Sequence, residues 1–208
     1  MEYKEIRDIL IASIVLAVAF AVLRVGGILD IFDNMNTATT LLLVSFITVP
    51  TSFVFHELGH RYLARKYNCY AEFRMWPFGL ILALVTGLSG LGLFAAPGAV
   101  YIHPRSDMWG TPVHISKKRM GLISLIGPAI NVALAGIFSL LFILLPAYDY
   151  IFSVGISINL ILALFNMIPF PPLDGSKIFA WDKKIWIAFV IAAAGAYISY
   201  LYFLPSAI

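Results

Sequence analysis

Long runs of apolar residues alternate along the chain with short charged clusters. A helix needs about 20 apolar residues to cross a bilayer, and five uncharged or nearly uncharged runs approach or exceed this length. They are Ile9–Leu29, Thr37–Phe55, Met120–Tyr148, Ile151–Phe170 and Ile185–Ile208. The first run contains one charged residue, Arg24, which can extend toward an interface, and the other four contain none. The pattern therefore predicts five membrane-spanning helices.

A sixth apolar run, Pro77–Ile102, differs from the others because glycines occur throughout it. Glycine inside a helix costs about 1 kcal/mol relative to alanine, so one straight helix is not expected here. We predict a re-entrant segment or a hairpin instead. The expected fold class is all-α: a polytopic transmembrane helix bundle with a small irregular or β-hairpin or re-entrant segment.

Composition agrees with a membrane protein of one domain. Hydrophobic residues make up 61% of the chain and charged residues 12%, whereas soluble domains carry about 25% charged residues. The single cysteine, Cys69, excludes an internal disulfide. Because repeats and low-complexity segments are missing from the sequence, we expect a single domain over residues 1–208, with core helices at about 37–67, 120–148 and 151–178.

The net charge of +3 indicates membrane topology and not nucleic-acid binding, because the basic residues lie at the ends of the apolar runs. If Pro77–Ile102 enters and leaves the membrane on one side, all 14 lysines and arginines except Arg24 fall on one side of the bilayer. The loops with Asp30 and Asp33 and with Asp149 then fall on the other side. Since basic residues favour the cytoplasm, we predict a multi-pass integral membrane protein with a cytoplasmic N-terminus.

The sequence His56-Glu57-Leu58-Gly59-His60 is the first candidate for chemistry. Histidines four positions apart share one face of a helix, and two such imidazoles can bind one zinc ion. Glu57 can reach a water on the open side of the metal and accept its proton, because zinc lowers the pKa of water toward about 7. The motif begins ten residues before Lys66, roughly 15 Å along a helix, so it starts inside the apolar layer. Ionisable groups at that depth are expected to be functional.

A catalytic zinc needs a third protein ligand. The candidates are Glu72, His103, His114, Asp149 and Asp174. Asp174 follows Pro169, Pro171 and Pro172, which break a helix and leave an extended stretch. Such a stretch is tolerated at membrane depth only inside protein or beside a watery cavity, and it can bring Asp174 back toward His56. The alternative is that Asp174 is a helix-capping or turn residue.

Three motifs together resemble the site-2 protease family of intramembrane zinc metalloproteases. They are His56-Glu57-Leu58-Gly59-His60, Gly127-Pro128-Ala129-Ile130-Asn131, and the segment from Asn166 to Gly175 with its spaced prolines and Leu-Asp-Gly. The resemblance covers roughly residues 37–178. It implies that His56, His60 and Asp174 bind Zn²⁺ and that Glu57 is the general base. It also implies transmembrane protein substrates, cleaved within or near the bilayer at an active site that opens toward the cytoplasm.

Two asparagines are candidates for substrate contact. Asn131 and Asn166 could donate hydrogen bonds to a developing oxyanion or hold the substrate strand. The alternative for both residues is a hydrogen bond between helices, because polar side chains join helices in membranes.

Other protein classes fit the sequence less well. A zinc-binding membrane protein without protease activity, either a transporter or an inactive scaffold, is the main alternative. A transporter should carry ionisable residues along a whole path, and the external halves of the predicted helices contain almost none. A membrane-anchored protease with its catalytic site in the cytoplasm would need a longer polar segment. The expected function is an intramembrane zinc metalloendopeptidase acting on transmembrane proteins, and the sequence leaves substrate identity and oligomeric state open.

Overall fold

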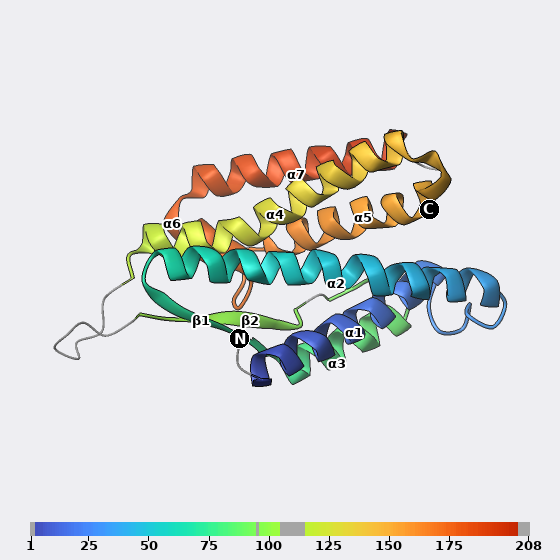
Figure 1. Ribbon diagram of the computed structural model, residues 1–208, viewed down its shortest axis with the longest axis horizontal. Coiled ribbons are helices and arrows are strands. Elements are labelled where there is room, and N and C mark those ends of the chain that lie inside the picture. The colour runs from blue at the N-terminus through green and yellow to red at the C-terminus, as the bar shows by residue number, and fades with distance from the viewer. Residues whose placement is uncertain (1–2, 95, 105–114, 204–208) are drawn as a thin grey trace. The chain divides into compact units, whose positions relative to one another are not determined.

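The computed structural model describes residues 3–94, 96–104 and 115–203, which are mainly helical (Figure 1). The helices are α1 (Tyr3–Val25), α2 (Met35–Lys66), α3 (Pro77–Leu88), α4 (Lys117–Leu144), α5 (Asp149–Asn166), α6 (Asp174–Trp181) and α7 (Lys183–Phe203), with a 3₁₀ turn, η1, at Pro146–Tyr148. The strands β1 (Cys69–Met75) and β2 (Gly98–Pro104) pair in a two-stranded antiparallel sheet. This architecture confirms the predicted fold class.

Five helical segments are long and apolar enough to cross a membrane: α1, α2, α4, η1 with α5, and α7. They coincide with the five predicted runs, so the protein is a multi-pass membrane protein. The helix α2 has 32 residues and is about 48 Å long. Because a bilayer core is about 30 Å thick, α2 can cross it and still carry a charged end beyond it.

The glycine-rich run does not form a spanning helix. Its first part is α3, which has 12 residues and a length of about 18 Å, and its last part belongs to β2. Gly90 follows α3 with a φ of +72°, and a Cβ there would lie 2.1 Å from the Gly26 carbonyl oxygen. The sharp turn after α3 therefore requires a glycine, as the composition of this run indicated.

The chain divides into two compact units. Unit 1 comprises Met1–Val54 and Phe73–Ala99, and unit 2 comprises Phe55–Glu72 and Val100–Ile208. Within unit 1, α1 packs against α3. Glu5 and Asp8 of α1 accept hydrogen bonds from the backbone N–H groups of Phe73 and Met75, each at 3.3 Å. These carboxylates are therefore satisfied by the backbone of β1.

Unit 2 contains all the candidate site residues. Within it α4 packs against α5 and α6, and α5 packs against α7 (Figure 1). Its core includes two clusters of buried side chains among the described residues. One comprises Ala64, Cys69, Ala71 and Ile123, and the other comprises Ala135, Ile156, Leu160 and Tyr200.

A break separates α5 from α6, as the three prolines predicted. The helix α5 ends at Asn166, and α6 begins at Asp174. Gly175 packs tightly against the start of this break, since a Cβ there would lie 2.2 Å from the Met167 carbonyl oxygen. The same carbonyl accepts a 2.7 Å hydrogen bond from Nε1 of Trp186 in α7. Contacts from α6 and α7 thus both hold the Met167 carbonyl, at the start of the break.

Candidate metal centre

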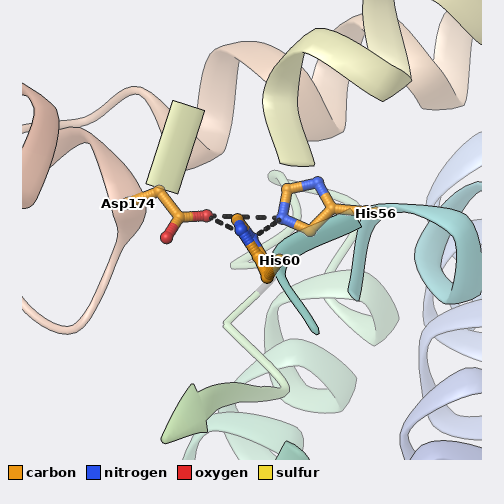
Figure 2. Close-up of side chains that lie close together, drawn as sticks. All are labelled: His56, His60 and Asp174. Carbon is orange, nitrogen blue, oxygen red and sulfur yellow. Dashed lines mark hydrogen bonds and ion pairs between the residues drawn. The ribbon is translucent and has the colours of Figure 1, made fainter. Parts of the chain in front are cut away.

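Two histidines and an aspartate converge in unit 2. His56 and His60 lie on successive turns of α2, are almost fully buried, and bring their Nε2 atoms to 3.0 Å from each other. Asp174 opens α6 and places Oδ2 3.3 Å from Nε2 of His56 and 2.9 Å from Nε2 of His60 (Figure 2). The helix break therefore returns Asp174 to the histidines, as expected from the prolines before it.

The outer nitrogens of both rings contact oxygen atoms from α4. Nδ1 of His60 lies 2.6 Å from the Ile123 carbonyl oxygen, and Nδ1 of His56 lies 2.5 Å from Oδ1 of Asn131. Oxygen of this kind only accepts hydrogen bonds, so each Nδ1 carries the hydrogen. A neutral imidazole has one N–H, and both Nε2 atoms consequently present lone pairs to Asp174 and to each other.

This arrangement fits a metal ion. Electron-rich atoms about 3 Å apart repel one another unless they share a cation. Ligands at 2.0–2.1 Å around a tetrahedral zinc lie about 3.3–3.4 Å apart, close to the observed 2.9–3.3 Å. Among the described residues, His56, His60 and Asp174 are the group of three that could hold a metal in this way. Of the other predicted third-ligand candidates, Glu72, His103 and Asp149 are not in this group, and His114 lies outside the described residues.

Gly127 lets α4 approach the two imidazoles directly. A Cβ at this position would lie 2.5 Å from Cε1 and Nε2 of His60 and 2.6 Å from Nε2 of His56. Real Cβ atoms essentially never come this close to another heavy atom. The absence of a side chain at Gly127 therefore leaves the space that both rings occupy.

The charge of Asp174 is supported by its neighbours. Burial disfavours ionisation of its carboxyl, whereas the positive charge of the nearby Lys177 ammonium favours it. Lys177 Nζ lies 3.4 Å from Oδ1, the oxygen that is not directed at the histidines. Asp174 is therefore poised as an anionic ligand.

Glu57 lies beside His56 on α2 and is buried, with 8% of its surface exposed. Its Oε2 atom has no hydrogen-bond partner among the described residues. A buried polar atom without a partner is costly, so this oxygen is suited to meet a water molecule or a substrate group. Its role as the general base stays a prediction.

The two predicted substrate-binding asparagines lie in different surroundings. Asn131 of α4 is fully buried and contacts His56, which favours a role in holding that ring over contact with an oxyanion. Asn166 ends α5, and its Nδ2 donates a 3.0 Å hydrogen bond to the Leu162 carbonyl oxygen. Contact of Asn166 with a substrate stays a prediction.

Sequence reasoning missed two partners of the site. The Ile123 carbonyl that fixes His60 belongs to the backbone and leaves no signal in the sequence. Asn159 of α5 donates nothing to the metal group but accepts a 2.9 Å hydrogen bond from Nδ2 of Asn131. The sequence did contain a signal for it, because a polar amide within a long apolar run is unusual.

Comparisons with known proteins agree with the site. "Putative zinc metalloprotease MJ0611" of Methanocaldococcus jannaschii is 38% identical over 203 residues, covering 96% of this chain and 95% of the relative. "Putative zinc metalloprotease YwhC" of Bacillus subtilis is 32% identical over 162 residues, covering 64% of this chain and 65% of the relative. No protein-family profile matches the chain, and no solved structure matches it. Because the first relative is similar over nearly its whole length, the chain belongs to this family of zinc metalloproteases.

Proposed function

We propose that the protein is an intramembrane zinc metalloendopeptidase of the site-2 protease type, which hydrolyses peptide bonds of transmembrane proteins within or near the bilayer. One observation carries the proposal: the group of His56, His60 and Asp174 takes two of its members from α2, a helix long and apolar enough to cross the membrane. A metal-binding group in such a helix is costly unless it has a function.

His56, His60 and Asp174 would hold the zinc ion, which is the cofactor, through Nε2, Nε2 and Oδ2. Three protein ligands with an open fourth position are typical of catalytic zinc, whereas structural zinc has four. When bound, zinc supplies Lewis-acid chemistry: it polarises a peptide carbonyl and makes water more acidic.

Glu57 would accept the proton of the attacking water and return it to the leaving amine. Its place on α2 next to His56, its burial and its unpartnered Oε2 support this role. Glu57 does not belong to the group of His56, His60 and Asp174. In this proposal it acts on the water and is not a metal ligand.

The segment between α5 and α6 would receive the substrate. A peptide carbonyl inside a helix is hydrogen-bonded to the helix itself, so the substrate must unwind locally before it can be cleaved. Residues 168–172 are exposed and are separated from Asp174 only by Leu173, and Asn166 at the end of α5 would hold the unwound strand. The distribution of basic residues supports an active site that opens toward the cytoplasm.

The alternative is a zinc-binding membrane protein without protease activity, and one paired experiment separates the two. Purified protein is incubated with a transmembrane substrate, and zinc content and cleavage rate are measured on the same preparation for the parent chain and for Glu57→Gln. Glutamine keeps the shape of glutamate but cannot accept the proton. We expect about one zinc per chain in both proteins and cleavage slower by roughly 10²–10⁴-fold in the variant.

A chelator should abolish cleavage by the parent chain. Cleavage by Glu57→Gln at nearly the parent rate would rule out Glu57 as the base, and loss of zinc in this variant would show that Glu57 holds the metal or its ligands. A parent chain with full zinc and no cleavage of any transmembrane substrate tested would favour the alternative.

A further inference from the structure

A chain of buried hydrogen bonds leads across two helices of unit 2 and ends on His56. In α5, Nδ2 of Asn159 donates to the Gly155 carbonyl oxygen at 2.8 Å. Oδ1 of Asn159 accepts from Nδ2 of Asn131 in α4 at 2.9 Å, and Oδ1 of Asn131 lies 2.5 Å from Nδ1 of His56. Both asparagines have no exposed surface.

The chemistry of the first group fixes the direction of the whole chain. The Gly155 carbonyl oxygen can only accept, so the amide nitrogen of Asn159 must face it. The amide oxygen of Asn159 then faces Asn131 and requires the nitrogen of that side chain. The amide oxygen of Asn131 is left for His56, whose Nδ1 must therefore carry a hydrogen.

We propose that Asn159 is a positioning residue for the metal: acting through Asn131, it holds His56 in the tautomer whose Nε2 lone pair is available to zinc. If the Asn131 amide were turned by 180°, its N–H group would face Nδ1. That orientation favours the hydrogen on Nε2, where it blocks coordination. This inference rests on the proposed role of His56 as a zinc ligand.

The two histidines are fixed by different means, and this makes the inference testable. His60 donates directly to a backbone carbonyl, that of Ile123, whose orientation is set by α4 itself. His56 depends on a side chain that can turn. Asn159 opposes the turn through its contact with Nδ2 of Asn131, and its loss should affect His56 and not His60.

The first variant is Asn159→Leu, which removes the acceptor for Nδ2 of Asn131 and with it the contact that opposes a turn of that amide. Loss of a partner behind a metal ligand typically lowers metal affinity by roughly 10–100-fold, and we expect a loss in this range. Zinc affinity is measured by competition with a chelator on purified full-length protein. The absorption spectrum of the Co²⁺-loaded protein reports the metal's surroundings independently of proteolysis.

Ser153→Ala is the matched control. Ser153 is another fully buried polar residue of α5, and its Oγ shares a 3.1 Å hydrogen bond with the Tyr200 hydroxyl. Its loss also removes a buried hydrogen bond from α5 but leaves the chain of hydrogen bonds from Asn159 through Asn131 to His56 intact. We expect parental zinc affinity and an unchanged Co²⁺ spectrum in this control.

The second variant, Asn131→Asp, makes the contact between Asn159 and residue 131 unnecessary. Either oxygen of a carboxylate accepts the hydrogen of His56 Nδ1, so the side chain has no wrong orientation. We expect Asn131→Asp to bind zinc and the added change Asn159→Leu to lower its affinity by less than threefold, compared with roughly 10–100-fold in the parent chain. If Asn159 only fills space in α5, the loss should be the same in both backgrounds.

Three outcomes would overturn the inference: parental zinc affinity in Asn159→Leu, a Co²⁺ spectrum that this change does not alter, or equal losses in the two backgrounds. If Asn159→Leu does not fold alone, the comparison of Asn131→Asp with and without Asn159→Leu carries the test. If Asn131→Asp rescues zinc binding in the presence of Asn159→Leu but the parent chain cleaves no substrate, the proposed protease activity is rejected and the role of Asn159 in holding His56 stands.

Discussion

At the scale of single residues, one face of α4 contacts both histidines of the candidate metal centre. Ile123, Gly127 and Asn131 follow one another at intervals of four, so they lie on the same side of the helix. The first contributes a carbonyl to His60, the last contributes an amide oxygen to His56, and Gly127 between them leaves room for both rings. Small changes on this face should therefore act directly on the metal.

Gly127→Ala tests the close approach. The new methyl group would overlap with the space occupied by both imidazoles, and because it is attached to a helix backbone the rings must move. We expect zinc affinity to fall by at least about tenfold, the lower end of the effect of disturbing the surroundings of metal ligands. Gly136→Ala is the control on the same helix, since nothing lies within 4 Å of a Cβ at that position. Elemental analysis showing full zinc in Gly127→Ala would contradict the geometry of the site.

Asp174→Ala tests the third ligand. Removing the carboxylate leaves only two histidines, and we expect zinc to be lost during purification. Asp149→Ala should retain full zinc, because Asp149 is an exposed aspartate at the start of α5, outside the metal group. A metal content in Asp174→Ala equal to that of the control would remove Asp174 from the ligand set.

At the scale of elements, the break between α5 and α6 decides whether the site is complete. A continuous helix through residues 167–173 would place Asp174 about 12 Å beyond Asn166 along the axis of α5. The prolines prevent this, while Gly175 and the bond from Trp186 fasten the segment to its place. The position of this segment therefore depends on α7 as well as on its own sequence.

Trp186→Phe tests the contribution of α7. Phenylalanine keeps an aromatic ring beside Phe179, whose centroid lies 5.3 Å from that of Trp186, but it cannot donate to the Met167 carbonyl. One hydrogen bond contributes about 0.5–1.5 kcal/mol, so we expect zinc affinity to fall by about two- to tenfold. A chelator-competition measurement that gives the parental affinity would show that the segment is held without this bond.

At the scale of the whole molecule, the connectivity of the five spans determines which loops share a side. With five crossings, the segment between α2 and α4 and the segment between α5 and α7 lie on the same side of the bilayer. The first follows the histidines of α2, and the second contains Asp174. The histidines of α2 and Asp174 can thus meet on one side of the bilayer without a further membrane crossing.

Single cysteines introduced into a chain with Cys69→Ser test this topology. We expect cysteines at Lys118 and Lys183 to react only with an impermeant reagent applied from the cytoplasmic side. Cysteines at Asp33 and Asp149 should react only from the outside. All four positions are exposed, so a missing reaction reports the side and not burial. Labelling of Lys118 and Lys183 from opposite sides would reject the five-span topology.

Much of the architecture could be predicted because it depends on local sequence. The length of an apolar run fixes a span, the spacing of His56 and His60 fixes a shared face, and consecutive prolines fix a break. The partner of Asn159, the Ile123 carbonyl and the contact at Gly127 could not be predicted in the same way. They depend on which faces of α4, α5 and α2 meet, and no pattern within one helix contains that information.

The distance in sequence between the metal ligands has a consequence for synthesis. Asp174 follows His60 by more than a hundred residues, and a ribosome adds about 5–20 residues per second. For several seconds the growing chain therefore carries two histidines in the bilayer without the carboxylate that completes their site. We therefore expect a nascent chain of this kind to hold metal weakly. Activity should appear only after Asp174 has been translated and its segment has returned to the histidines.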